Sequence, residues 1–218
     1  MNTFESVAAN ARTYGLSLVG WFHPEPEDDV PGTPGTLLLI GADGPNMWNI
    51  FKESPEANDG EPHPMDRWSR RVISDLADRA GGKALFPFGG PPWLAFQRWA
   101  SRGEGARQSP TVLQVTPTRG LWASYRGAIA FADHVDLPTR NDADPCLDCP
   151  APCLTACPVN AFSDGTYDVP GCTAYLASGL VECRNGCLVR SACPAGANVE
   201  LPTEQRAFHM AAFLKANA

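Results

Sequence analysis

The sequence lacks the features of several protein classes. It contains no apolar run of about 18 residues, so no membrane-spanning helix is expected. The first residues, MNTFESVAAN, carry neither a basic segment nor a continuous apolar stretch, so no signal peptide is expected. A basic excess is also missing. The net charge is −7, which argues against nucleic acid and against an anionic membrane surface as partners.

Two common site patterns are missing as well. No Gly-x-Gly-x-x-Gly sequence follows a predicted strand, so a Rossmann nucleotide site is not expected. The histidines have no ligand spacing and are expected at the surface or in loops. They are His23, His63, His134 and His209.

Cysteine is absent from most of the chain and concentrated in one part of it. All eight cysteines lie between residues 146 and 193. Both halves of this block end in Cys-Pro. The spacing is Cys146-x2-Cys149-x3-Cys153-x3-Cys157-Pro158, then an isolated Cys172, then Cys183-x3-Cys187-x5-Cys193-Pro194.

Three explanations for this block compete. Disulfides are typical of small secreted domains, whereas this chain has 218 residues and no visible signal peptide. Cysteine zinc sites usually combine two separated Cys-x2-Cys pairs, whereas here four cysteines fall within 12 residues. Runs that end in Cys-Pro are typical of paired [4Fe-4S] clusters, in which the last cysteine of a run binds the other cluster. We therefore predict two [4Fe-4S] clusters and retain zinc as the alternative.

The exchange of last cysteines predicts the ligands of each cluster. The first set is Cys146, Cys149, Cys153 and Cys193, and the second set is Cys157, Cys172, Cys183 and Cys187. Ligand thiols must be deprotonated, and clusters would be destroyed in an oxidising compartment. A cytoplasmic location is therefore expected.

The stretch from Asp144 to Gly196 resembles the double-cluster ferredoxin module of epoxyqueuosine reductases and reductive dehalogenases. The matching pieces are CLDCPAPCLTACPVNAF, GCTAYL and ECRNGCLVRSACPAG. This chain departs from that module by one extra residue before Cys153 and by wider spacings in the last set. No counterpart of the proton donor of epoxyqueuosine reductases can be placed, and the chain is shorter than those enzymes. Their tRNA-modifying activity is therefore not carried over.

Periodicity predicts an α+β domain over residues 1–138 and a cluster-binding module over residues 139–218. Thr203 is expected to cap the last helix. Helices are expected at 4–11, 46–53, 64–80, 93–101 and 203–217, strands at 16–22, 36–41 and 83–86, and a hairpin from 112–116 and 121–131.

The strand predicted at 121–131 contains a charged residue in apolar surroundings. Simple alternation places Leu121, Ala123, Tyr125, Ile129 and Phe131 on one face and Trp122, Ser124, Arg126, Ala128 and Ala130 on the other. Neither face is strongly polar, so a central strand covered on both sides is expected. Arg126 then needs a partner, which is either a structural ion pair or an anionic group of a ligand.

The segment QVTPTRGLWASYRGAIAFADHVDLP, with LVGWF and PGTLLLIG, resembles the CblC (MMACHC-type) cobalamin-processing family. The resemblance implies a nitroreductase-like α+β fold with a corrinoid cavity, and it places the counterpart of Arg126 at the pocket for cofactor and thiol cosubstrate. No Asp-x-His-x-x-Gly motif is present to supply a histidine to the cobalt. The loop FPFGGPPW is either a second wall of this cavity or an ordinary turn. The candidate cofactor-binding residues are Arg126, Trp122, Ser124, Gly89 and Gly90.

Three functions are compatible with this pattern. The first is an oxidoreductase whose two clusters relay electrons to a corrinoid in the N-terminal domain. Under this hypothesis cobalamin is a better candidate than FMN for the additional cofactor. The second is a ferredoxin-like electron-transfer protein without catalysis, whose N-terminal domain docks a partner. The third is a flavin-dependent reductase. In each of them a reduced ferredoxin or flavodoxin is the expected type of electron donor.

Overall fold

The computed structural model describes residues 2–140, 142–179 and 181–217. The chain forms two compact units. The first comprises Met1–Ala106 and Ser124–Asp142, and the second comprises Arg107–Ala123 and Ala143–Ala218. The cysteine-rich unit therefore includes Arg107–Ala123, here named the inserted segment, which lies upstream of the expected boundary at residue 138. Across the described residues, no helix is both long and apolar enough to cross a membrane.

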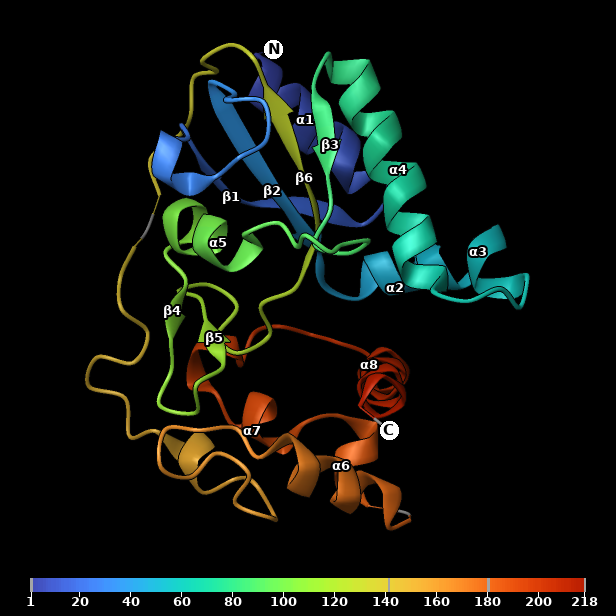
Figure 1. Cartoon of the computed structure of the whole chain (residues 1–218), viewed down its shortest axis with the longest axis vertical. Coiled ribbons are helices and arrows are strands. Elements are labelled where there is room, and N and C mark those ends of the chain that lie inside the picture. Colours follow the sequence, from blue (N-terminus) through green and yellow to red (C-terminus); the bar gives the residue numbers. More distant parts are fainter. Residues whose placement is uncertain (1, 141, 180, 218) are drawn as a thin grey trace. The chain divides into compact units, whose positions relative to one another are not determined.

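Each unit has its own set of elements (Figure 1). The first unit contains α1 (Thr3–Arg12), β1 (Leu16–Phe22), β2 (Thr36–Ala42), α2 (Gly44–Lys52), α3 (Pro55–Asn58), α4 (Pro64–Ala80), β3 (Lys83–Leu85), α5 (Phe96–Glu104) and β6 (Tyr125–Phe131). The second unit contains β4 (Arg107–Gln108), β5 (Gln114–Val115), α6 (Val169–Ala177), α7 (Leu188–Ser191) and α8 (Thr203–Ala216).

The first unit is built on a four-stranded sheet with the order β1-β2-β6-β3, in which each pair of neighbours is antiparallel. The strands expected at 16–22 and 36–41 and the helix expected at 64–80 are confirmed. The expected central position of the strand that contains Arg126 is also confirmed, because β6 lies between β2 and β3. The predicted α+β class therefore holds for this unit, and its sheet is antiparallel.

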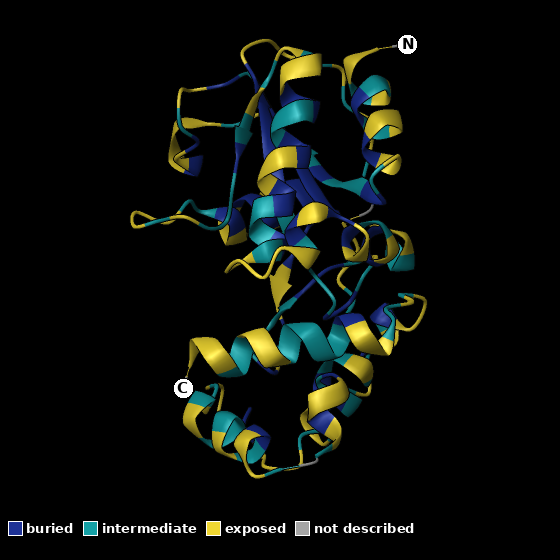
Figure 2. Ribbon diagram, turned by 90° about the vertical axis from the view of Figure 1, so that its right-hand side faces the viewer, coloured by how far each residue is buried: buried dark blue, intermediate teal, exposed yellow. Residues whose placement is uncertain are grey.

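Helices cover both faces of this sheet. Leu37 and Leu39 of β2 belong to one core with Phe96 and Trp99 of α5. The alternate residues of β2 are also fully buried, on the face that α1 and α4 cover. Figure 2 shows the burial concentrated in the strands and in the helix sides that face them. A sheet buried on both faces explains why its strands read as continuous apolar runs.

The hairpin predicted from 112–116 and 121–131 is wrong. The turn itself forms, because the backbone groups of Thr116 and Gly120 exchange two hydrogen bonds of 3.0 Å. Beyond the turn the two segments separate: β5 pairs with β4, whereas β6 pairs with β2 and β3. The apolar strands of the sheet bury β6 more completely than the two-residue strand β5 could.

The C-terminal helix forms where it was expected, but its cap differs from the prediction. Gln205 is its buried residue, whereas the apolar Ala211 is exposed. Pro202 rather than Thr203 occupies the N-cap position. The helix packs on short turns of the second unit, which cover less of it than a sheet would.

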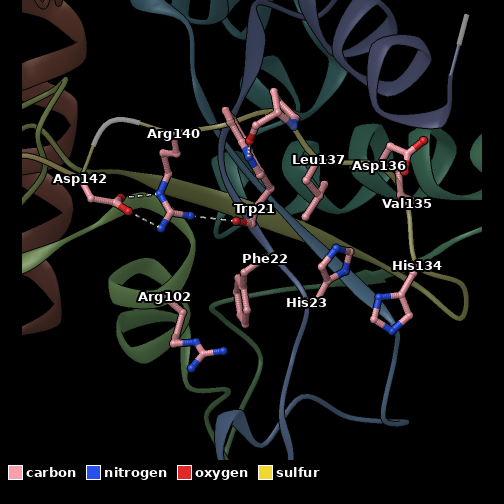
Figure 3. Close-up of a pocket in the computed structure, with 11 residues that line it drawn as sticks. Trp21, Phe22, His23, Arg102, His134, Val135, Asp136, Leu137, Arg140 and Asp142 are labelled. Atoms are coloured by element: carbon pink, nitrogen blue, oxygen red, sulfur yellow. Dashed lines mark hydrogen bonds and ion pairs between the residues drawn. The ribbon is translucent and has the colours of Figure 1, made fainter.

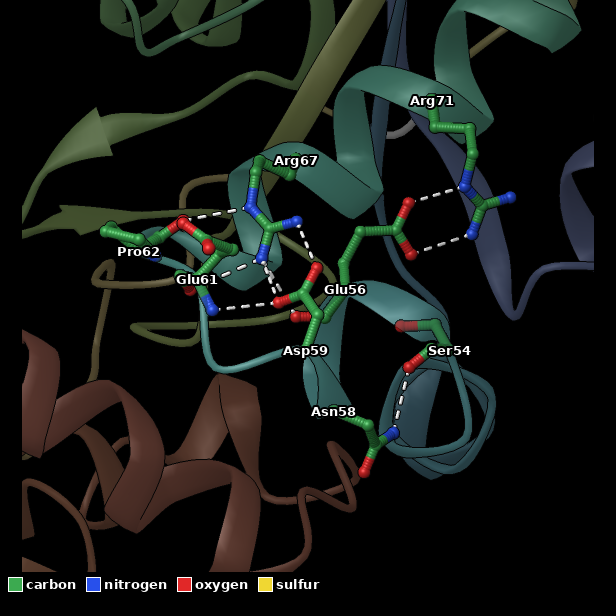
Figure 4. A network of polar contacts seen from close by, with 8 residues as sticks. All are labelled: Ser54, Glu56, Asn58, Asp59, Glu61, Pro62, Arg67 and Arg71. Carbon is green, nitrogen blue, oxygen red and sulfur yellow. Dashed lines mark hydrogen bonds and ion pairs between the residues drawn. The ribbon is translucent and has the colours of Figure 1, made fainter.

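Ion pairs connect the short helix α3 to α4 (Figure 4). Arg71 of α4 binds both carboxylate oxygens of Glu56, with Nε–Oε1 and Nη2–Oε2 distances of 2.5 and 3.0 Å. Arg67 binds both carboxylate oxygens of Asp59 at 2.7 Å. The Glu56 side chain is only 11% exposed, and the Arg71 guanidinium lowers the pKa of that carboxyl.

Replacing Glu56 with glutamine is expected to lower the free energy of unfolding at pH 7 by about 1 kcal/mol, because the half-exposed Arg71 loses a charged acceptor. The folded-state pKa is depressed, so the stabilisation is complete above the ordinary glutamate pKa of roughly 4.3 and is lost as the pH falls through the folded-state value. Urea denaturation of both proteins should therefore give curves that converge in acid. Asp59→Asn, which alters the more exposed pair, should have the smaller effect, and a pH-independent difference at Glu56 would contradict this account.

Candidate functional site

The first predicted set of cysteines comes together in the second unit. All eight cysteines have free thiols. Burial, the Asp144 carboxylate and the neighbouring thiols of Cys149, Cys193 and Cys153 raise the pKa of Cys146. Burial and the Cys193 thiol likewise raise the pKa of Cys153. Cys193 thus lies near Cys146 and Cys153, which precede it by 40 residues or more, as the predicted exchange requires.

The loop that carries the first three cysteines turns sharply. Asp148 has a φ of 59° and Ala151 a φ of 51°, which is the left-handed region that residues other than glycine seldom adopt. Ala151 is the middle residue of the Cys149–Cys153 spacing, where this chain has one residue more than the reductase modules. The left-handed turn accommodates that residue and keeps the thiols of this short run together.

The inserted segment forms one wall of the first cysteine set. Val115 and Leu121 belong to the same apolar core as Cys153 and Cys193. The Arg190 guanidinium donates a hydrogen bond to the carbonyl oxygen of Leu121. At Gly120 a Cβ atom would lie 2.8 Å from Cys193 Sγ, so only glycine allows this close approach.

The second set lines a common cavity. The four thiols share it with apolar side chains, one of which comes from α8. The cavity is lined by Cys157, Cys172, Cys183 and Cys187 together with Pro158, Val159, Phe162, Tyr175, Leu188, Val189 and Met210. These four cysteines are the predicted ligands of the second cluster, and the sequence had distributed them over 31 residues.

Hydrogen bonds already reach the sulfur atoms of the second set. The backbone N–H of Ala161 donates to Cys157 Sγ at 3.3 Å. The Tyr167 hydroxyl bonds to Cys172, and burial together with this bond raises the pKa of the tyrosine. Burial raises the pKa of Cys172 and Cys183, and their neighbouring thiols add to the increase. Binding iron would remove these protons, since only thiolates are ligands.

The donor groups of the second set match the predicted cluster in number and kind. Among the described residues, no three His, Cys, Asp or Glu side chains are arranged to share a single metal ion. Four thiols around one largely apolar cavity, with N–H and O–H donors directed at sulfur, provide the environment that a [4Fe-4S] cluster requires. The identity of the group that they bind remains a prediction.

A β-bulge in the first unit positions Arg126. Ile40 of β2 pairs with Gly127 and Gly41 pairs with Tyr125, so Arg126 is an extra residue in β6. The bulge reverses the alternation, and the expected arrangement of faces is wrong for Tyr125. This residue packs with Ala128 on the α5 face, where its hydroxyl donates to Glu104 Oε2 at 2.6 Å.

The bulge leaves the Arg126 guanidinium incompletely paired. Its Nη2 lies 3.3 Å from the Ser124 hydroxyl, and its buried Nε has no hydrogen-bond partner among the residues that the structure describes. Burial lowers the pKa of Arg126, and the Asp66 carboxylate of α4 opposes that effect. Asp66 is the partner that a structural role requires, while the unpaired Nε is the donor that an anionic ligand would use.

The other three cofactor candidates lie in different surroundings. Trp122 belongs to the second unit, where it packs against Gly196. Gly89 has a φ of 87° and lies against Arg70, whose guanidinium is 4.8 Å from the centroid of the Phe86 ring. The space beside Gly90 is filled by Pro92 of the same loop. Ser124 is therefore the candidate that the structure brings into contact with Arg126.

The first unit also contains an open pocket of about 640 Å³, which no pattern in the sequence predicted (Figure 3). Its lining includes His23 and His134, whose ring centroids are 4.4 Å apart. They meet because strand pairing brings distant segments together, so their contact cannot be predicted from their spacing in the sequence. Arg102 is paired with Glu25 at 3.0 Å, and Arg140 binds both carboxylate oxygens of Asp142. The cations of this pocket are therefore already neutralised.

Solved structures of epoxyqueuosine reductases share this fold. A selenomethionine-labelled enzyme is 15% identical with a TM-score of 0.56, and the Bacillus subtilis enzyme is 17% identical with a TM-score of 0.55. A third structure, which holds an epoxyqueuosine-modified tRNA-Tyr stem loop, is 16% identical with a TM-score of 0.57. Each match covers 93% of this chain and 68% of the other.

Identities this low establish a common fold. The predicted likeness to epoxyqueuosine reductases is thereby confirmed at the level of the fold, whereas the CblC-like domain and the ferredoxin-like module remain predictions. No protein-family model matches the sequence, and no curated protein matches it.

Proposed function

We propose that this protein is an iron–sulfur redox protein whose second unit holds two [4Fe-4S] clusters. The proposal depends mainly on one observation: the eight thiols gather as two sets of four, and each set contains a cysteine from the other run. In a cubane cluster each cysteine binds a different iron atom, so four thiols around one space suit it. Such clusters supply one-electron transfer.

We further propose that the electrons pass to a cofactor held by the first unit, with a corrinoid ranked ahead of FMN. The shared fold with epoxyqueuosine reductases supports a cofactor-binding role for this unit. Arg126 and Ser124 would orient an anionic or amide group of the cofactor, and the unpaired Nε would donate the hydrogen bond. The alternatives are an electron carrier without catalysis and a flavin-dependent reductase.

Binding of nucleic acid by this chain needs a direct test. The net charge of −7 predicts no such partner, yet one epoxyqueuosine reductase with this fold was solved with a tRNA stem loop. A gel-shift measurement with an RNA stem loop tests whether this chain binds RNA. Low salt is used because phosphate contacts weaken steeply as salt is added. A shifted band would favour an RNA partner, and no shift would agree with the expectation from the net charge.

Anaerobic reconstitution tests the proposal. Eight irons and eight sulfides per chain are expected for two cubane clusters, and zinc without sulfide would contradict them. Titration with cob(II)alamin and with FMN, followed by visible absorbance and electron paramagnetic resonance, then distinguishes the cofactors. Binding of neither would leave the carrier function.

Replacing Arg126 with methionine is expected to weaken binding of the preferred cofactor at least tenfold without lowering the thermal midpoint. A buried guanidinium with an unpaired Nε contributes little to stability, and methionine fills much of the same volume. A purely structural ion pair with Asp66 predicts the opposite, namely a lower midpoint and unchanged binding. Arg126→Lys retains the charge and should bind the cofactor with intermediate affinity.

Replacing Tyr167 with phenylalanine is expected to lower the reduction potential of the second cluster. Hydrogen bonds to ligand sulfur favour the reduced, more negative cluster, and Tyr167 provides one to Cys172. A redox titration monitored by electron paramagnetic resonance measures the shift. Tyr175 lines the same cavity, and Tyr175→Phe should leave the potential unchanged. Equal shifts in both variants would assign the effect to packing.

A further inference from the structure

Exposed apolar side chains are concentrated beside the cysteines. Four large apolar side chains are clearly exposed within the part of the chain that the structure describes, and three of them are Leu147, Leu154 and Val159. Leu147 is 73% exposed and Leu154 is 47% exposed. Exposed leucines beside half-buried and buried cysteines are unfavourable for an isolated protein, and such positions often mark an interaction surface.

Two of these side chains belong to the first cysteine set. Leu147 lies between Cys146 and Cys149, and Leu154 directly follows Cys153. These three thiols are neighbours, so both leucines are attached to the backbone that surrounds them. Val159 instead lines the cavity of the second set. The apolar surface over the first set is therefore formed by Leu147 and Leu154.

The loop that carries these leucines is acidic, and one of its aspartates is paired with an arginine of the inserted segment. Residues 143–168 contain four aspartates and no lysine, arginine or histidine. Asp148 is exposed next to Leu147, and Asp144 is exposed with Arg107 4.0 Å away. Asp164 and Asp168 are also exposed. A partner that covers the leucines therefore meets carboxylates at the rim and gains from carrying positive charge there.

We propose that Leu147, Leu154, Asp144 and Asp148 form the docking surface for an electron-carrier protein whose redox centre is ringed by lysines or arginines. This inference rests on the proposed function, since it needs a cluster in the first set. The reduced carrier gives one electron to the oxidised cluster, and no proton or atom is transferred. The acidic docking surface narrows the range of expected electron donors, because its carboxylates would repel a ferredoxin or flavodoxin with an acidic face.

Stopped-flow electron transfer tests the surface in the reconstituted full chain. The protein is reduced with dithionite, separated anaerobically from the remaining dithionite, and mixed with oxidised mitochondrial cytochrome c, a basic probe whose ferric haem accepts one electron. The variant Leu147→Gln with Asp148→Asn should transfer electrons roughly tenfold more slowly than the unaltered protein, and added salt should slow the unaltered protein more than the variant. Asparagine suits Asp148, whose φ is 59°.

Matched controls carry the same kinds of change elsewhere. Trp93→Ser removes an exposed apolar side chain that is 66% exposed, and Glu200→Gln removes an exposed carboxylate of the second unit. Both should transfer electrons at the unaltered rate, and an acidic flavodoxin should react slowly with every protein. Intact clusters with equal rates in all variants would overturn the docking surface alone. Failure to assemble any cluster would overturn both the proposed function and this inference.

Discussion

Replacing Cys157 with alanine is expected to abolish the second cluster and to retain the first. Cys157 belongs to the first run of cysteines, only four residues after Cys153, yet its side chain lines the cavity of Cys172, Cys183 and Cys187. Losing one of four thiolates leaves an iron without a protein ligand, and such a cluster is labile. Iron and sulfide should fall to about half of the reconstituted value.

The reciprocal variant makes this test specific. Cys146→Ala should remove the first cluster and retain the second, because the thiols near Cys146 are Cys149, Cys153 and Cys193. The two variants should therefore lose different components of the electron paramagnetic resonance spectrum, and the two remaining spectra should add up to that of the unaltered protein. Loss of the same component in both variants would show that the first run forms one cluster by itself.

Replacing Gly120 with alanine is expected to damage the first cluster as severely as removing one of its ligands. A Cβ at this position would lie 2.4 Å from the backbone nitrogen of Gly196 and 2.8 Å from Cys193 Sγ. Both separations are far below van der Waals contact, and the nearest atom is backbone. Cys193 must therefore move, although the substitution changes no ligand.

Gly165→Ala is the matched control. Gly165 has a φ of 68°, close to the 53° of Gly120, but apart from its two chain neighbours no described residue has an atom within 4 Å of its hypothetical Cβ. The two substitutions therefore introduce similar backbone strain of roughly 1–2 kcal/mol, and only Gly120→Ala adds a collision with the ligand. Iron content and spectra should distinguish them. Equal damage by both would point to backbone strain instead of the contact with Cys193.

Local patterns in the sequence were sufficient where one element determines its own structure. The strand Leu16–Phe22 and the helix Pro64–Ala80 form within the expected limits, because apolar periodicity and flanking turn residues act over a few positions. The Cys-Pro endings predict an exchange of ligands between the two runs, and the thiols that lie near one another agree with that exchange, while the clusters stay a prediction.

Features that depend on contacts between distant segments could not be predicted from local patterns. The bulge at Arg126 depends on how β2 pairs with β6, and a single extra residue reverses which face Tyr125 occupies. His23 and His134 meet only after the sheet has formed. Gln205 is buried although its helix shows little amphipathic pattern, so neighbouring turns rather than its own sequence decide its exposure.

The route of the chain through the inserted segment affects how the protein can be divided. The backbone leaves the first unit after Ala106, returns at Ser124 and leaves again after Asp142. A fragment that begins at residue 143 would retain every cysteine but lose Val115, Gly120 and Leu121 from around Cys193. This fragment could therefore not be excised, or fused to another protein, without loss of part of the surroundings of Cys193. During synthesis, part of that environment leaves the ribosome before any cysteine does.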